Sequence, residues 1–121
     1  MADVMLQQLG LDDTVFDEFV EYEASHSISE LCAGRIDAAV FVVGHPNDIV
    51  ARTLKECNAT IVAIVGPNAD KIAANHADYQ KVKIVVGLYG VEGDPVDSLA
   101  VVATLVTRAS IEHQLVADLV R

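Results

Sequence analysis

The chain has no Trp, and its 121 residues include only three Phe and three Tyr. Few aromatic rings are therefore present on which nucleic-acid bases could stack. Lys and Arg number eight against 18 Asp and Glu, which gives a formal net charge of -10. Proteins that bind nucleic-acid phosphates concentrate basic side chains on one face, so this composition argues against nucleic acid as a partner.

Long apolar runs are also missing. The two longest candidates, residues 36–44 and 98–107, have the length of strands rather than of membrane spans. The sequence therefore predicts a protein that is not embedded in a membrane. The N-terminus shows no basic region followed by an apolar run and a small-residue cleavage site, so no export signal is visible.

Only two cysteines occur, Cys32 and Cys57, and their spacing fits neither a CxxC redox pair nor a zinc cluster. Because Cys is among the most buried residue types, two buried free thiols are the favoured interpretation. A disulfide between them is the alternative.

Motifs of catalysis and cofactor binding are absent as well. The sequence contains no H-E-x-x-H, no G-x-S-x-G and no G-x-x-x-x-G-K-[ST]. Gly87, Gly90 and Gly93 are regularly spaced, but no helix start follows them as a dinucleotide site requires. We therefore expect no metal, no cofactor and no enzymatic activity.

The sequence does contain a continuous run, residues 27–47, that reads as helix, strand and turn. Ser27 and Glu30 have the spacing of a capping box, and Gly34 can end the helix in the left-handed conformation. Residues 38–43 are apolar on both faces, as in a strand inside a parallel sheet. A Gly-His-Pro-Asn turn follows.

Helices and strands alternate along the whole chain. Helices are expected over 2–9, 27–33, 46–57, 67–75 and 110–120, with Ser110 as a cap, and strands over 19–22, 38–43, 60–65, 82–86 and 98–107. This alternation predicts a single α/β domain over residues 1–121, with a mostly parallel sheet flanked by helices.

The turn at Gly44, His45, Pro46 and Asn47 is the predicted binding site. It joins the carboxyl end of a buried strand to a helix start, where free N–H groups and the positive dipole end favour a small anion. His45 is either a ligand contact or an ordinary loop residue. Tyr89, in the Gly-rich loop, either covers a ligand with its hydroxyl or is a surface Tyr.

Several segments, in their order along the chain, resemble segments of one family. They are residues 34–47, Ile64-Val65-Gly66-Pro67, Gly87-Leu88-Tyr89-Gly90, Asp94-Pro95-Val96 and residues 103–107. Together they make nearly the whole chain resemble the TAXI group of TRAP-transporter solute-binding proteins. The cleft-facing turn of that family falls on Gly44, His45 and Pro46, with Asn47 beside it, and its loop tyrosine falls on Tyr89. Many members have a small residue where His45 stands, so backbone groups are the expected ligand contacts.

The resemblance implies a periplasmic, bilobal receptor with lobes of the type II-like periplasmic-binding fold. Such a receptor closes on a small anionic solute, such as glutamate or a dicarboxylate, and delivers it to TRAP membrane subunits. Residues 1–121 would be one lobe, the second, with 98–121 near the hinge. The competing hypothesis is an effector-sensing domain of a bacterial transcriptional regulator, which shares this fold. A small α/β enzyme is the weakest alternative. We also expect a homo-oligomer formed through the exposed cleft face or through an exchanged terminal element.

Overall fold

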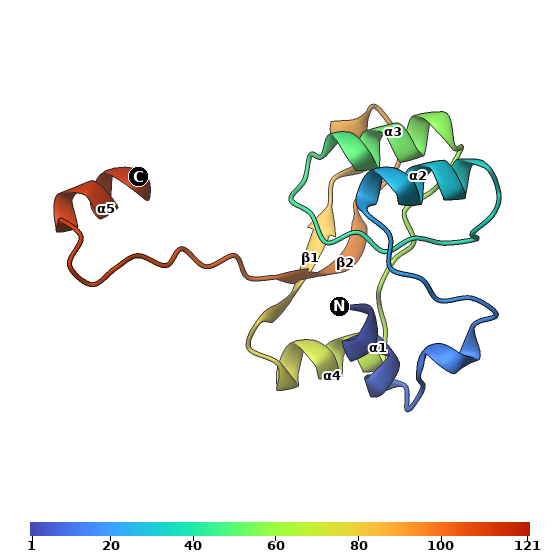
Figure 1. Cartoon of the computed structure of the whole chain (residues 1–121), viewed down its shortest axis with the longest axis horizontal. Helices are drawn as coiled ribbons and strands as arrows, with labels where there is room; N and C mark the ends of the chain where they lie inside the picture. The colour runs from blue at the N-terminus through green and yellow to red at the C-terminus, as the bar shows by residue number, and fades with distance from the viewer.

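A computed structural model describes residues 1–121, and it shows a body of helices around a small sheet from which a C-terminal arm extends (Figure 1). Five α-helices, two 3-10 turns and two strands follow one another along the chain. They are α1 (Ala2–Gln8), η1 (Asp13–Val15), α2 (Ala24–Cys32), α3 (Asp48–Glu56), α4 (Pro67–Asn75), β1 (Tyr79–Ile84), η2 (Val86–Tyr89), β2 (Val96–Val101) and α5 (His113–Leu119). The predicted mixed α/β class is confirmed.

The prediction of a mostly parallel sheet is wrong. The sheet has two strands, β1 and β2, which run antiparallel with Tyr79 opposite Val101 and Ile84 opposite Val96. Only residues 85–95 connect them. An antiparallel pair can be joined by so short a connection, whereas a parallel pair needs a longer crossover, usually a helix. The predicted strands 82–86 and 98–107 overlap β1 and β2, but each observed strand begins and ends earlier than its prediction.

The other three predicted strands, over 19–22, 38–43 and 60–65, do not form. One backbone hydrogen bond, from the Ile64 N–H to the Asp97 oxygen at 2.9 Å, joins the third of them to β2. Val40 and Val42 remain 56% and 54% exposed. A strand that is apolar on both faces needs neighbours on both sides to complete its ladder, and this chain folds without placing them there.

Helix predictions succeed where local chemistry decides. Helix α4 spans Pro67–Asn75 as expected, because Pro at the first turn loses no helical hydrogen bond. Gly34 adopts a φ of +73° after α2, as predicted for its stop signal. The prediction of a capping box at Ser27 is wrong. Helix α2 begins at Ala24, so Ser27 lies within the helix.

Glu30 has a different role from the predicted cap. Its carboxylate accepts two hydrogen bonds from Arg35, at 2.8 and 2.7 Å, and lies 3.3 Å from His26 Nε2. These Arg35 hydrogen bonds lower the pKa of Glu30 below its ordinary value. The pair fixes the corner where the chain leaves α2. The expected cap at Ser110 is also wrong, since α5 begins after Glu112.

Cys32 and Cys57 form a disulfide, so the favoured interpretation of free thiols is wrong. Cys32 is the last residue of α2 and Cys57 follows α3 directly, and their Cα atoms lie 4.5 Å apart. That separation suits a bridge. The sequence spacing alone could not show that the ends of two helices meet.

The core is small, with eight of the 121 residues buried. Ala69 and Ile72 of α4 pack with Leu99 of β2, and Val4 and Met5 of α1 lie against this cluster. The core therefore joins the N-terminal helix, α4 and the sheet. It leaves many apolar side chains elsewhere on the surface.

Candidate functional site

The predicted turn lies on the surface directly before α3. Gly44, His45 and Pro46 are exposed and Asn47 is half-buried. Asn47 is the N-cap: its side-chain Oδ1 accepts from the N–H groups of Ile49 at 2.9 Å and Val50 at 3.4 Å. Asn is favoured at this position because it satisfies N–H groups that have no partner within the helix.

Tyr89 reaches this turn from η2, more than 40 residues along the chain. Its hydroxyl accepts a hydrogen bond from the Asn47 N–H at 3.1 Å and is hydrogen-bonded to His45 Nδ1. The His45 and Tyr89 rings meet edge to face, with centroids 5.8 Å apart. The structure thus brings together His45, Asn47 and Tyr89, three residues that sequence analysis singled out separately or by resemblance.

The direction of the bond between Tyr89 and His45 depends on the His45 tautomer, whereas the Asn47 N–H donates to the Tyr89 hydroxyl in either case. In the tautomer in which Nδ1 accepts from Tyr89, the other ring nitrogen, Nε2, carries the hydrogen. Because His45 is exposed, that N–H is a donor available to a ligand.

The backbone amides of the turn divide into used and free donors. Those of Asn47, Ile49 and Val50 are already bonded, as described above. The amides of Gly44 and His45 have no hydrogen-bond partner within the chain. The Asp48 N–H, at the first residue of α3, has no partner within the chain either, but it lies beside the carboxylate of Asp48 itself.

The cap makes a testable contribution to stability. Replacing Asn47 by Ala should lower the free energy of unfolding by about 1 kcal/mol, because two helical N–H groups lose their acceptor. Urea unfolding followed by circular dichroism measures this loss. Asn75→Ala, at the last residue of α4, is the matched control and should change stability little. An equal loss in both variants would contradict the role of Asn47.

The other histidines lie away from the turn. His26 stacks on Tyr22 beside Glu30, His76 meets Tyr79 edge to face, and His113 is the first residue of α5. No group of three His, Cys, Asp or Glu side chains comes together in a way that could hold a metal ion. His45 is thus the histidine whose surroundings suit a ligand.

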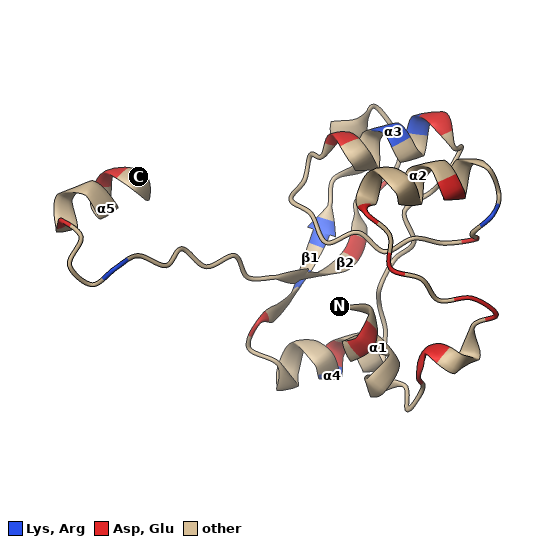
Figure 2. Ribbon diagram, viewed as in Figure 1, with Lys and Arg blue, Asp and Glu red and all other residues tan.

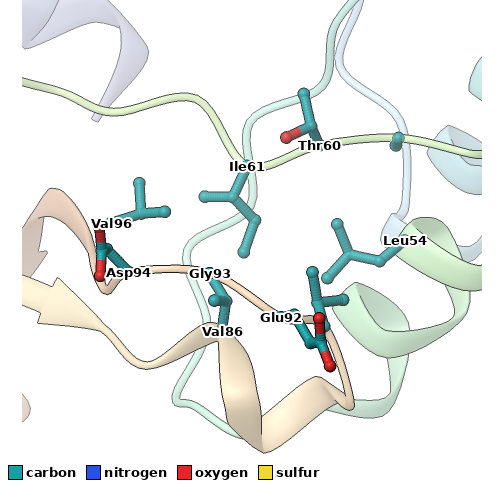
Figure 3. A pocket seen from close by; sticks show the side chains of 10 residues that line it. Leu54, Thr60, Ile61, Val86, Glu92, Gly93, Asp94 and Val96 are labelled. Atoms are coloured by element: carbon teal, nitrogen blue, oxygen red, sulfur yellow. The ribbon is translucent and has the colours of Figure 1, made fainter.

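A cavity of about 200 Å³ has none of the turn residues in its lining (Figure 3). Leu54, Ile61 and Val86 line it with apolar side chains, and Glu92 and Asp94 also belong to its lining. Acidic residues beside a cavity make it less favourable for an anion.

Charge over the rest of the surface is dispersed. Figure 2 shows basic residues on α3, on β1 and on separate loops rather than in one segment. The two lysines of β1 are engaged: Lys81 contacts Asp70 at 2.7 Å and Lys83 contacts Asp97 at 2.6 Å. The Asp70 contact raises the pKa of Lys81.

Sequence reasoning missed two parts of this arrangement. It placed Asn47 beside the ligand but overlooked its cap, although Asn just before a helix is a known start signal. It also gave no reason for Tyr89 to meet His45, because no local pattern reports a contact between residues 44 positions apart.

A small mixed α/β body with an exposed polar turn at a helix start is consistent with a binding-protein lobe. The model of the NMT1-like family matches residues 1–121, and the chain belongs to that family. It is a periplasmic-binding-like family, whose members typically bind solutes outside the cytoplasm. No curated protein matches the sequence significantly. None of the helices combines the length and apolarity needed to cross a bilayer.

Proposed function

We propose that residues 1–121 form one lobe of a bilobal extracytoplasmic receptor of the TAXI type. The receptor binds a small carboxylate, such as glutamate or a dicarboxylate, and delivers it to the membrane subunits of a TRAP transporter. Membership of the NMT1-like family supports the solute-binding part of this proposal. The resemblance of residues 34–47 and 87–90 to TAXI proteins supports the finer part.

The observation that carries the proposal is the cluster at the turn. Gly44 and His45 offer free amides, and the exposed His45 side chain is hydrogen-bonded to the Tyr89 hydroxyl through Nδ1, which leaves Nε2 without a partner in the chain. Amide and imidazole N–H groups are the donors that suit a carboxylate, and they bind it without breaking bonds. Pro46 and Asn47 complete the turn, and Asn47 caps the start of α3.

The other lobe of the receptor, its first, would face this turn. Closure would be a hinge motion in which the solute bridges both lobes, and residues 98–121 would lie near the hinge. Gly44, His45 and Pro46 are exposed, so the turn is accessible to the other lobe of the receptor. A receptor of this kind needs no cofactor.

Titration calorimetry of the receptor that contains this lobe tests the proposal. Glutamate or succinate should release or absorb heat with a saturable isotherm, while lysine, which adds a positive charge, should bind more weakly. Heat from none of the carboxylates would contradict the proposed solute class.

The Tyr89→Phe variant tests the site itself. Without its hydroxyl the His45 ring and the Asn47 amide lose their shared partner, so the solute should bind about fivefold more weakly, equivalent to about 1 kcal/mol. Tyr79→Phe is the matched control, because the Tyr79 hydroxyl makes no hydrogen bond within the chain. Unchanged affinity in the Tyr89 variant would remove Tyr89 from the site.

A further inference from the structure

The C-terminal arm, defined as residues 102–121, leaves the body where β2 ends (Figure 1). The Val102 N–H donates to the Asp78 oxygen at 2.9 Å. Beyond that bond, every hydrogen bond and ion pair of the arm stays within the arm. The body therefore does not hold the arm in place through polar contacts.

The arm is rich in uncovered apolar side chains. Those more than 45% exposed are Val102, Leu105, Val106, Leu115, Leu119 and Val120. Helix α5 has seven residues. Isolated helices shorter than about 12–15 residues are marginal in water, and in proteins most helices are stabilised by packing an apolar face. The arm thus has the composition of an element that packs on another surface.

The body offers a matching edge over residues 60–65, here called the open edge. The single hydrogen bond from Ile64 to Asp97 places this extended segment beside β2. Its other side is unpaired, and Val62 and Val65 are 76% and 62% exposed. An extended apolar segment with free N–H and C=O groups is a template for an added strand.

The open edge and the first part of the arm are chemically alike. Residues 60–65 read TIVAIV and residues 102–107 read VATLVT, so neither carries a charge or a Pro. Both are rich in β-branched residues, which favour strands. In a chain of net charge -10, neutral segments are the ones that can approach another copy without repulsion.

The solvent-exposed surface of the chain is larger than that of a compact monomer of the same mass. A compact monomer of 12.9 kDa exposes about 6,300 Å². This chain exposes 8996 Å², about 2,700 Å² more. Stable protein interfaces bury about 1,600 Å² in total, so the excess is sufficient for a dimer interface.

We propose that two copies of the chain exchange their arms. Residues 102–107 of one copy add as a strand to the open edge of the other, and α5 packs its apolar side chains over the exposed valines of that body. The second copy does the same in return, which gives a closed twofold dimer. This pairing satisfies the backbone groups of the open edge and covers the arm in one step. It concerns residues 1–121 by themselves and does not depend on the proposed ligand, whereas in a bilobal receptor the same arm would lie near the hinge.

Light scattering after size-exclusion chromatography tests the exchange. The chain should show twice its 12.9 kDa mass at high concentration and dissociate on dilution. Val106→Lys and Val62→Lys should each weaken the dimer about tenfold or more, because each places a charge in the new strand pair. Both side chains are exposed, at 82% and 76%, so the variants should fold. Val15→Lys, at an exposed valine of η1, is the control and should leave the dimer intact.

A crosslinking experiment identifies the pairing itself. Val62→Cys and Val106→Cys are prepared as separate proteins, mixed and oxidised, and a mixed disulfide dimer should form. Val15→Cys mixed with Val106→Cys should give none. A monomer at every concentration, a dimer unaffected by both lysine variants, or equal crosslinking in the control mixture would each overturn the proposal. An arm that folds back on its own body would give the first result.

Discussion

Replacing Ile72 by Ala should lower the free energy of unfolding by about 2–5 kcal/mol, a large part of the about 5–15 kcal/mol that stabilises a typical domain. Ile72 is 2% exposed and packs with Ala69 and Leu99, which link α4 to β2. Removing three carbon atoms there leaves a void that a core of eight buried residues has little means to fill. Urea unfolding followed by circular dichroism measures the loss.

Leu9→Ala is the control for this experiment. Leu9 is 51% exposed at the end of α1, so its truncation should change stability by much less than that of Ile72. If the two variants lost equal stability, the cluster around Ile72 would not be the centre of the fold.

Breaking the disulfide should have an effect of similar size. The bridge closes a loop of 25 residues between Cys32 and Cys57. A crosslink over a loop of this length stabilises by about 3 kcal/mol, mainly by restricting the unfolded chain. The double variant Cys32→Ser with Cys57→Ser should therefore unfold at a clearly lower urea concentration than the oxidised protein.

Reduction of the native protein provides an independent measurement. A thiol reductant should lower the unfolding midpoint of the native chain toward that of the double serine variant. The serine variant itself should not respond to the reductant. A reductant effect on that variant, or none on the native chain, would contradict a stabilising bridge.

The helices could be predicted from the sequence because their signals are local. Pro67 at the first turn of α4 and Gly34 after α2 act through their own backbone conformations. Strands depend on partners elsewhere in the chain, so residues 38–43 could look like a buried strand and still remain unpaired. The capping box at Ser27 failed because α2 continues three residues further toward the N-terminus, where no side-chain cap marks its start.

The candidate site was predicted in its parts but not in its geometry. The turn chemistry points to Gly44 to Asn47, whereas Tyr89 is singled out by its place in the Gly-rich loop and again by the family resemblance. The tie between Tyr89 and the turn, and the bridge between Cys32 and Cys57, both depend on contacts across the fold. Such contacts are set by packing, which a single sequence does not report.

The position of the disulfide gives α3 two unequal ends. Cys57 tethers its C-terminal end to α2, whereas Asn47, at the opposite end, is joined across the fold through the Tyr89 hydroxyl. A nine-residue helix is about 13.5 Å long. A tilt of about 10° about the tethered end would therefore displace the far end by about 2 Å. His45 lies next to the N-terminal end of α3, which is the end that moves. A small rotation of α3 about its disulfide-bonded end is therefore enough to reposition the donors of the turn.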